Sequence, residues 1–344
     1  KKLNMSKKDL NAILKDCFKN NIEFSEIYQN FQKKLDSFRK KNFLIAVSGG
    51  PDSLALTALS KAYEYNNNCK IYYVLIDHKI RKKSSIEALS VKKLLKKHKI
   101  KLKIIENKKK ITKNIQNEAR NARYHLLASF CKKNKINYIL TAHHLNDQVE
   151  TFFIRLSRGS GLDGLSSMKQ VTDLNDNVKV VRPLLDLKKN KLMQLSKKVF
   201  GRYYLDPSNN DDKYLRIRIR KLRMSLEKSG IKYDQISKSI KNLASSRDTL
   251  DIYFNKIYKD AVNKKKNKVF MNYKHLKSLN SEMKMRVFKK SIKDYTNSYY
   301  APRSKKVVSL IEQIFMKKNA RLTLGGCLIS RDQNHIILEK EPKK

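Results

Sequence analysis

A short polar segment between an apolar run and a helical pattern limits what this chain can fold into. It follows residues 43–47, which predict a buried parallel strand, and leads into residues 53–65, which predict a helix. Glycines at such a junction let backbone N–H groups approach an anion, and the helix N-terminus adds partial positive charge. The segment lacks the Gly-Lys-Ser/Thr ending of a Walker A loop, so we expect a phosphate-binding loop of another type. Its residues are Ser48, Gly49, Gly50, Pro51, Asp52 and Ser53.

The net charge of the chain is +47 over 344 residues. Such an excess of lysine and arginine favours a polyanionic partner, and nucleic acid is the first candidate. Part of the charge has a second explanation, because Lys, Asn and Ile are all abundant, as an A/T-rich genome would dictate. No basic amphipathic helix with large apolar anchors stands out, so we expect no membrane partner.

The four cysteines, Cys17, Cys69, Cys131 and Cys327, lie far apart and form no Cys-x-x-Cys pair. This spacing argues for a reducing compartment and against a disulfide framework or a cysteine-based metal site. No apolar run approaches the length of a membrane-spanning helix, and no signal-peptide pattern opens the chain. We therefore expect a cytoplasmic protein.

From residue 41 the pattern alternates between strand and helix. This alternation predicts an α/β fold with a doubly wound parallel sheet, in which ligands bind beyond the carboxyl ends of the strands. The polar clusters at 48–53, 77–81 and 143–150 all follow predicted strands, so we expect them on one edge of the sheet. The expected strands are 43–47, 71–76, 101–106 and 138–142, and the expected helices are 53–65, 84–98, 115–134 and 147–157.

The alternation stops near residue 210, after a loop-rich stretch at 158–187. We expect a helical N-terminal extension at 1–39, a catalytic domain at 40–210, and a second, smaller, mostly helical domain at 211–344. A strongly basic helix at about 214–227 opens this last part, and a small sheet formed by three short apolar stretches closes it. Those stretches are 320–324, 327–331 and 335–339.

Six further motifs follow the polar loop in a recognisable order. The loop itself resembles the pyrophosphate loop of ATP pyrophosphatases, which split ATP into AMP and pyrophosphate. Together the motifs resemble the tRNA(Ile)-lysidine synthetases over about residues 40–225, which implies an adenine-nucleotide alpha hydrolase, or Rossmann-like, domain. The motifs are IDHKIR at 76–81, NIQNEARNARY at 114–124, TAHHLNDQVET at 141–151, RGSGLDGLSSM at 158–168, RPLL at 182–185 and DPSNNDDKYLRIRIR at 206–220.

Two positions depart from the family pattern. Lys79 replaces a glycine in the IDHKIR motif, which raises the question of how the backbone turns there. Asn146 replaces the first of two adjacent aspartates, which leaves Asp147 as the only carboxylate of that pair. Neither departure touches the pyrophosphate loop.

The resemblance implies a ligase that replaces the C2 oxygen of the wobble cytidine with lysine. Its substrates are ATP, free lysine and an isoleucine tRNA with a CAU anticodon, and Mg²⁺ offsets charge on the phosphates. The oxygen is first attached to the α-phosphate, and the lysine amine then displaces AMP. The resemblance leaves the oligomeric state open between monomer and homodimer.

The matching motif positions supply the candidate site residues. Asp52 and Asp147 are the expected metal ligands. Asp77 and His78 are expected to join the loop 48–53 in binding ATP, and a cap on the next helix is the open alternative for either of them. We expect one of His143 and His144 to face the site. Arg120 and Arg123 are expected to contact the α-phosphate or the tRNA backbone, although for Arg120 a surface pair with Glu118 or Glu150 is an open alternative. The expected tRNA contacts are Arg123, Arg216, Arg218, Arg220 and Arg223, and a solvated basic face is the alternative for the last four.

Three other functions compete with lysidine formation. A tRNA thiolase uses the same adenylation step, but commonly needs paired or positioned cysteines, which this chain lacks. An ATP pyrophosphatase acting on small molecules has no need of the surplus basic charge. A non-catalytic RNA-binding protein has no need of the complete loop 48–53. The sequence therefore favours the tRNA ligase.

Overall fold

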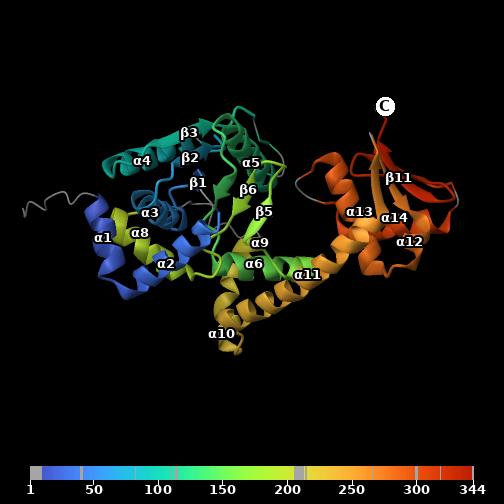
Figure 1. The fold of residues 1–344 in the computed structure, drawn as a ribbon. Coiled ribbons are helices and arrows are strands. Elements are labelled where there is room, and N and C mark those ends of the chain that lie inside the picture. Colours follow the sequence, from blue (N-terminus) through green and yellow to red (C-terminus); the bar gives the residue numbers. More distant parts are fainter. Residues whose placement is uncertain are drawn as a thin grey trace, which may run out of the picture. The chain divides into compact units, whose positions relative to one another are not determined.

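The structure is a computed structural model that describes most of the chain (Figure 1). The described residues are 10–38, 42–81, 83–109, 111–112, 115–204, 213, 215–265, 267–298, 301–317 and 319–342. The chain divides into two compact units, Lys1–Ala244 and Ser245–Lys344. The domain boundaries that we expect at residues 39 and 210 stay predictions. Most of the motif at 206–220 before residue 215 lies outside the described residues.

A six-stranded sheet forms the centre of the first unit. Its strand order is β3-β2-β1-β4-β6-β5, and every neighbouring pair is parallel except the edge pair β5 and β6. The expected doubly wound α/β fold is therefore confirmed, with one antiparallel edge strand added. The strands are β1 (Phe43–Val47), β2 (Ile71–Asp77), β3 (Leu102–Glu106), β4 (Tyr138–Leu140), β5 (Val171–Asp173) and β6 (Lys179–Val181).

Ten described helices accompany this sheet or lead out of the unit. They are α1 (Leu10–Lys19), α2 (Ile22–Asp36), α3 (Pro51–Asn66), α4 (Ser84–Lys97), α5 (Ile115–Lys133), α6 (Leu145–Leu156), α7 (Leu162–Leu165), α8 (Lys189–Phe200), α9 (Leu215–Lys221) and α10 (Arg223–Lys228). An eleventh, α11 (Tyr233–Ala261), continues into the second unit.

Successive side chains of β1 point to opposite faces of the sheet and enter different cores. Phe43 and Ile45 pack in the larger core, with residues of α1, α2, α3 and α8. Leu44 packs in a second core with Leu127 and Cys131 of α5. Both faces of the strand are thus covered by helices, which explains why its sequence is continuously apolar rather than alternating.

One local expectation for the first unit was confirmed in outline and one was wrong. The stretch 158–187 is rich in loops as expected, and it also contains α7, β5 and β6, whose strands of three residues leave almost no periodic signal. The single basic helix expected at 214–227 is two helices, α9 and α10, with Leu222 between them.

The second unit is built on a five-stranded antiparallel sheet, so the expectation of a mostly helical domain was wrong. The strand order is β7-β8-β11-β10-β9, and the small terminal sheet expected from the last three apolar stretches forms three of its strands. Strand β7 is a lysine-rich edge strand with little apolar pattern, so its sequence gave no strand signal. The elements are β7 (Val262–Lys265), β8 (Lys268–Asn272), α12 (Tyr273–Ser278), α13 (Ser281–Thr296), α14 (Ser304–Met316), β9 (Arg321–Leu324), β10 (Cys327–Arg331) and β11 (His335–Lys340).

No helix in the described part of the chain has both the length and the apolar character needed to cross a membrane.

Lys79 has φ +52, in the left-handed region that favours glycine. Its backbone N–H donates to the carboxylate of Asp77, 3.0 Å away, which holds the turn after β2 in this conformation. The turn therefore keeps the backbone shape expected of a glycine although a lysine occupies it. The lysine therefore has a strained backbone conformation.

Replacing this residue by glycine removes the strain. We expect Lys79→Gly to raise the midpoint of thermal unfolding by a few degrees, because the half-exposed ion pair that it sacrifices, between Lys79 and Glu106, stabilises little. Lys83→Gly is the control, since Lys83 has an ordinary φ of −91 and glycine there should lower the midpoint. Calorimetry of both variants checks the expectation, and equal shifts in the two would contradict it.

Candidate active site

The topology of the sheet places a crevice at the carboxyl ends of β1 and β4. From β1 the chain moves outward to β2 and β3, and then returns to place β4 on the other side of β1. Ligands of open α/β sheets bind at such a switch point, between the loops that diverge there. The loop after β1 is 48–50 and the loop after β4 is 141–144, so two of the three expected polar clusters flank the crevice.

The loop after β1 depends on Gly49. This residue has φ +84, and a Cβ added to it would lie 2.3 Å from Cγ2 of Val91 in α4. A side chain at this position would therefore be strained and would also displace a packed helix. The carbonyl of Gly49 accepts a hydrogen bond from the N–H of Tyr204 at 3.0 Å, which brings the segment after α8 against the loop.

Hydroxyl groups close the loop on itself. The Oγ of Ser53 accepts from the backbone N–H and from the Oγ of Ser48, each at 3.1 Å, and donates to the carbonyl of Gly50 at 3.0 Å. Gly50 is the N-cap of α3 and Pro51 is its first residue. Because Pro51 has no N–H, the free donors of the first turn come from the residues that follow it, at the positive end of the helix dipole. The result is a rigid anion-binding loop.

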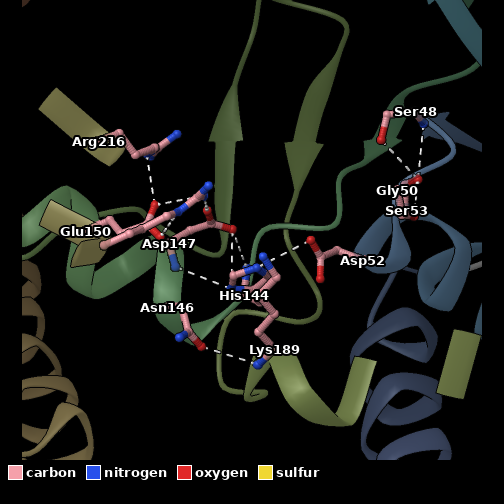
Figure 2. Close-up of polar contacts among 11 residues, drawn as sticks. Ser48, Gly50, Asp52, Ser53, His144, Asn146, Asp147, Glu150, Lys189 and Arg216 are labelled. Atoms are coloured by element: carbon pink, nitrogen blue, oxygen red, sulfur yellow. Dashed lines mark hydrogen bonds and ion pairs between the residues drawn. The ribbon is translucent and has the colours of Figure 1, made fainter. Parts of the chain in front are cut away.

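His144 links the two expected metal ligands (Figure 2). Its Nε2 lies 3.5 Å from Oδ2 of Asp52, and its Nδ1 lies 3.5 Å from Oδ2 of Asp147. The ring also serves as the N-cap of α6, because Nδ1 accepts the N–H of Asp147 while the N–H of His144 donates back to that carboxylate. Burial alone would lower the pKa of His144, but the hydrogen bond and charge of Asp52 and the charge of Asp147 raise it above its ordinary value.

Asp52 and Asp147 differ in how their oxygens are used. The Oδ1 atom of Asp52 is buried and has no hydrogen-bond partner among the described residues. Asp147 is almost enclosed, and although burial would raise its pKa, the charges of His144, His143 and Arg216 hold it below its ordinary value. Within the described ranges no three Asp, Glu, His or Cys side chains are grouped to hold a metal ion. A carboxylate oxygen without a partner among the described residues, beside the phosphate loop, nevertheless suits Mg²⁺, which takes one or two carboxylates and completes its shell with phosphates and water.

Glu150 is a residue of the site that we did not assign a role from the sequence. Its side chain is 3% exposed, and it accepts from Nε of Arg220 at 2.5 Å and from Nη2 of the same residue at 3.2 Å. Nε of Arg216 lies 3.1 Å from its other side, and Nη2 of Arg216 donates to Thr151 at 3.3 Å. Glu150 follows Asp147 by one helical turn, so both residues lie on the same face of α6. This spacing is the sequence signal that could have identified Glu150 as a site residue.

Arg216 and Arg220 therefore lie in the first unit and contact α6. Nη2 of Arg220 is also 4.0 Å from Oδ1 of Asp147. Of the other residues expected to bind tRNA, Arg218 is exposed, and Arg223 pairs with Glu227 at 2.9 Å and lies over the ring of Tyr233. The arginines of this basic region thus divide into an inner pair and an outer pair.

Asp77 and His78, at the end of β2, have different environments. Burial would raise the pKa of Asp77, but hydrogen bonds from Ser85, from the N–H of Lys79 and from Ser84 lower it. Its carboxylate therefore holds the two serine hydroxyls at the start of α4 and shapes the turn. Both ring nitrogens of His78 are buried without a hydrogen-bond partner among the described residues, and burial lowers its pKa to about 4. A neutral imidazole with both nitrogens free is suited to bind a polar ligand.

The remaining expected residues lie around this centre. Nδ1 of His143 is 2.9 Å from Oγ1 of Thr141, and burial lowers the pKa of His143 to about 3. Arg120 of α5 lies over the ring of Tyr124, 5.1 Å from its centroid. Arg123, one turn along α5, is exposed.

The departure at Asn146 leaves its local role in place. Its Oδ1 accepts the backbone N–H of Lys189 at 3.3 Å, which ties the start of α6 to the start of α8 (Figure 2). An aspartate oxygen could accept the same bond. Asn146 therefore acts here as a link between two helices.

Comparison with known proteins agrees with this geometry. The family described as the PP-loop domain matches residues 21–226. A tRNA(Ile)-lysidine synthase of Wolbachia pipientis wMel is 32% identical over 332 residues, which are 94% of this chain and 76% of that protein. The enzyme of the same name from Orientia tsutsugamushi is 43% identical over 185 residues, 53% of this chain and 41% of that protein.

A solved U34-tRNA thiolase from Methanococcus maripaludis, NcsA, has the same fold. It aligns with a TM-score of 0.54 at 18% identity, over 67% of this chain and 80% of that one. The match to the family and the loop at the switch point together define an ATP-binding PP-loop protein. Within that class, the chain belongs to the tRNA(Ile)-lysidine synthase family.

The hydrogen bonds to Asp77 make part of the stability dependent on pH. Because its folded-state pKa is lowered, the carboxylate stabilises the fold above its unfolded value, near 4, and loses this effect as the pH falls through the folded value. We expect Asp77→Asn to lower the free energy of unfolding at pH 7 by about 1–2 kcal/mol and the difference from wild type to vanish at low pH. Denaturant titrations from pH 7 to 2 check this, and a difference independent of pH would contradict it.

Substitution of the buried carboxylate of Glu150 should lower the free energy of unfolding more than substitution of most other residues. Glu150→Gln keeps the shape of the side chain but leaves two arginines without their counter-charge. We therefore expect the free energy of unfolding to fall by about 2–3 kcal/mol. This is less than the loss expected for a fully buried ion pair, because Arg220 is partly exposed. Glu227→Gln breaks the exposed pair with Arg223 and should cost under about 0.5 kcal/mol. If chemical denaturation gives equal losses of unfolding free energy in the two variants, Glu150 does not hold the two arginines in place.

Proposed function

We propose that this protein uses ATP to join free lysine to C2 of the wobble cytidine in the CAU anticodon of isoleucine tRNA. The reaction has two steps. The C2 oxygen attacks the α-phosphate and pyrophosphate leaves, and the lysine amine then attacks C2 and AMP leaves. The proposal rests on family membership and on one observation above all, the free buried oxygen of Asp52 beside the closed loop 48–53.

The loop and the first turn of α3 would bind the departing pyrophosphate. Their backbone donors are held in place by the bonds between Ser48, Gly50 and Ser53, so no reorganisation is needed when charge develops. Asp52, with Asp147 across the ring of His144, would hold Mg²⁺. The ion supplies neutralisation of negative charge on the phosphates.

His144 positions these carboxylates. One ring contacts both aspartates, so each is oriented by the same buried group, and the helix cap fixes the ring itself. Because Nδ1 accepts the N–H of Asp147, the ring proton is on Nε2, which faces the carboxylate of Asp52. His144 is therefore the histidine of the adjacent pair that we place in the site.

The inner and outer arginines would have different duties. Arg216 and Arg220 sit beside Asp147 and Glu150, where a guanidinium can meet an α-phosphate oxygen. Arg218 and Arg223, on the surface, together with Arg120 and Arg123 of α5, would contact the tRNA backbone. His78 and the turn capped by Asp77 would contact the nucleoside of ATP.

Thiolation of a tRNA base is the nearest alternative chemistry. Enzymes of that kind commonly need paired or positioned cysteines. The four cysteines here are free, and three of them are buried in the cores of α1, α5 and β10 rather than at the crevice. This placement favours lysidine formation.

Mass analysis of the tRNA tests the proposal directly. We expect wild-type protein, ATP, Mg²⁺ and lysine to add the mass of one lysine less one water to isoleucine tRNA with a CAU anticodon. Asp52→Asn should lower the rate by orders of magnitude with tRNA affinity almost unchanged, because the variant loses a ligand that acts in the adenylation step. Asp234→Asn, in an exposed pair with Lys188, is the control and should react like wild type.

Two results would contradict these assignments. Turnover of Asp52→Asn at the wild-type rate would remove Asp52 from the metal site. Formation of a thiolated product, or of no product by wild-type protein that binds both ATP and tRNA, would overturn the function.

A further inference from the structure

Helix α6 presents three different sides to its surroundings. Asp147 and Glu150 point to the charged groups of the site. An apolar side, which includes Val149, packs against the start of α11. The third side carries Gln148 and, about two turns later, Arg155. This third side holds the loop segment that follows α7.

The amide of Gln148 binds both backbone groups of one residue in that segment. Its Nε2 donates to the carbonyl of Met168 at 3.0 Å, and its Oε1 accepts the N–H of Met168 at 2.8 Å. A return bond comes from Ser167, whose Oγ donates to the carbonyl of Gln148 at 3.1 Å. A primary amide has the donor and the acceptor side by side that the first two bonds require.

The segment is also fixed on both sides of this contact. Before it, Nη1 of Arg155 donates to the carbonyls of Gly164 and Ser167, at 2.8 and 2.9 Å. After it, Nη1 of Arg182 donates to the carbonyl of Lys169 at 2.9 Å. Arg182 directly follows β6, which pairs in parallel with β4. The segment therefore connects α6 to the carboxyl end of the sheet.

Backbone strain is found at the same place. Ser167 has φ +55 and is only 4% exposed, so a serine adopts the left-handed conformation in a buried position. This conformation is unfavourable for residues other than glycine and persists only where the surrounding structure holds it. The hydrogen bonds that Ser167 makes with Gln148 and Arg155 supply that support.

The hydrogen bonds to Met168 control the rotation of α6 about its own axis. The apolar contacts with α11 are non-directional and tolerate a roll of the helix, whereas hydrogen bonds do not. Gln148 and Glu150 lie on opposite sides of the helix, because residues two apart point about 200° apart. The amide and the ion pairs of Glu150 therefore hold the helix from two sides. A roll would carry Asp147 away from the ring of His144.

We propose that Gln148 is a positioning residue of the ATP site, whose paired hydrogen bonds to Met168 set the rotation of α6 and so hold Asp147 in place to bind Mg²⁺ with ATP. The inference rests on the proposed function, in which Asp52 and Asp147 hold the ion. Groups that orient a metal ligand without touching the metal contribute strongly to metal affinity. Gln148 acts in this way through the helix.

The test measures how Mg²⁺ changes the affinity of the full chain for ATP in the absence of tRNA. Titration calorimetry with the non-hydrolysable α,β-methylene analogue of ATP is carried out with Mg²⁺ and again with a chelator. The variant is Gln148→Met, which keeps the length of the side chain and its neutrality but removes both hydrogen bonds.

Two control variants accompany it. Gln194→Met makes the same replacement at an exposed position of α8. Asn280→Ala removes the N-cap bond of α13 in the second unit, so it lowers stability without touching α6.

We expect Mg²⁺ to strengthen binding of the analogue by wild type and by both controls. In Gln148→Met the affinity with Mg²⁺ should fall about tenfold or more, while the affinity in chelator stays within about twofold of wild type. Ser167→Ala removes the return bond from the other side of the contact and should weaken the Mg²⁺-dependent affinity in the same direction. This second variant decides the question if Gln148→Met folds poorly.

Three results would overturn the proposal. They are a wild-type response to Mg²⁺ in Gln148→Met and Ser167→Ala, an equal loss of affinity with and without the ion, and the absence of any response in wild type. Because nucleotide binding is measured without tRNA or turnover, these results are distinct from a failure of lysidine formation, which mass analysis of the tRNA detects.

Discussion

The buried carboxylate of Glu150 sets the geometry around it. A charge enclosed to this degree must be paired, and Arg220 meets it with two hydrogen bonds while Arg216 lies against its other side. This contact joins α9 to α6, two helices that are about 70 residues apart in sequence. Helix α6 is capped by His144 and carries Asp147 in its first turn, so the contact also orients the end of the helix that holds these two residues.

The site gathers acidic side chains in a chain that is otherwise strongly basic. Three carboxylates lie around the ring of His144 and two arginines, although the whole chain carries +47. The two guanidinium groups offset part of the repulsion among these carboxylates. The surplus of lysine and arginine lies outside this cluster, where it can attract a polyanion from a distance.

The backbone is constrained more tightly at the phosphate loop than in the turn after β2. Gly49 adopts its positive φ where α4 packs directly on the phosphate loop, so no other residue is accommodated. Lys79 adopts a similar conformation in a more open turn, where hydrogen bonding to Asp77 compensates for the missing glycine. The departure from the family pattern is tolerated because the side chain points to solvent and pairs with Glu106.

The sequence by itself determined the parallel sheet, the strand-loop-helix at 43–65 and the class of chemistry, because buried strands and phosphate loops have local signatures. Tertiary structure alone decided which arginine meets which acid. Arg120 was a possible partner for Glu150, yet α9 supplies Arg216 and Arg220 instead. The sequence predicted only the last three strands of the antiparallel sheet in the second unit, since β7 is an edge strand whose lysines carry no pattern. Pairing between distant segments depends on packing, which no local spacing records.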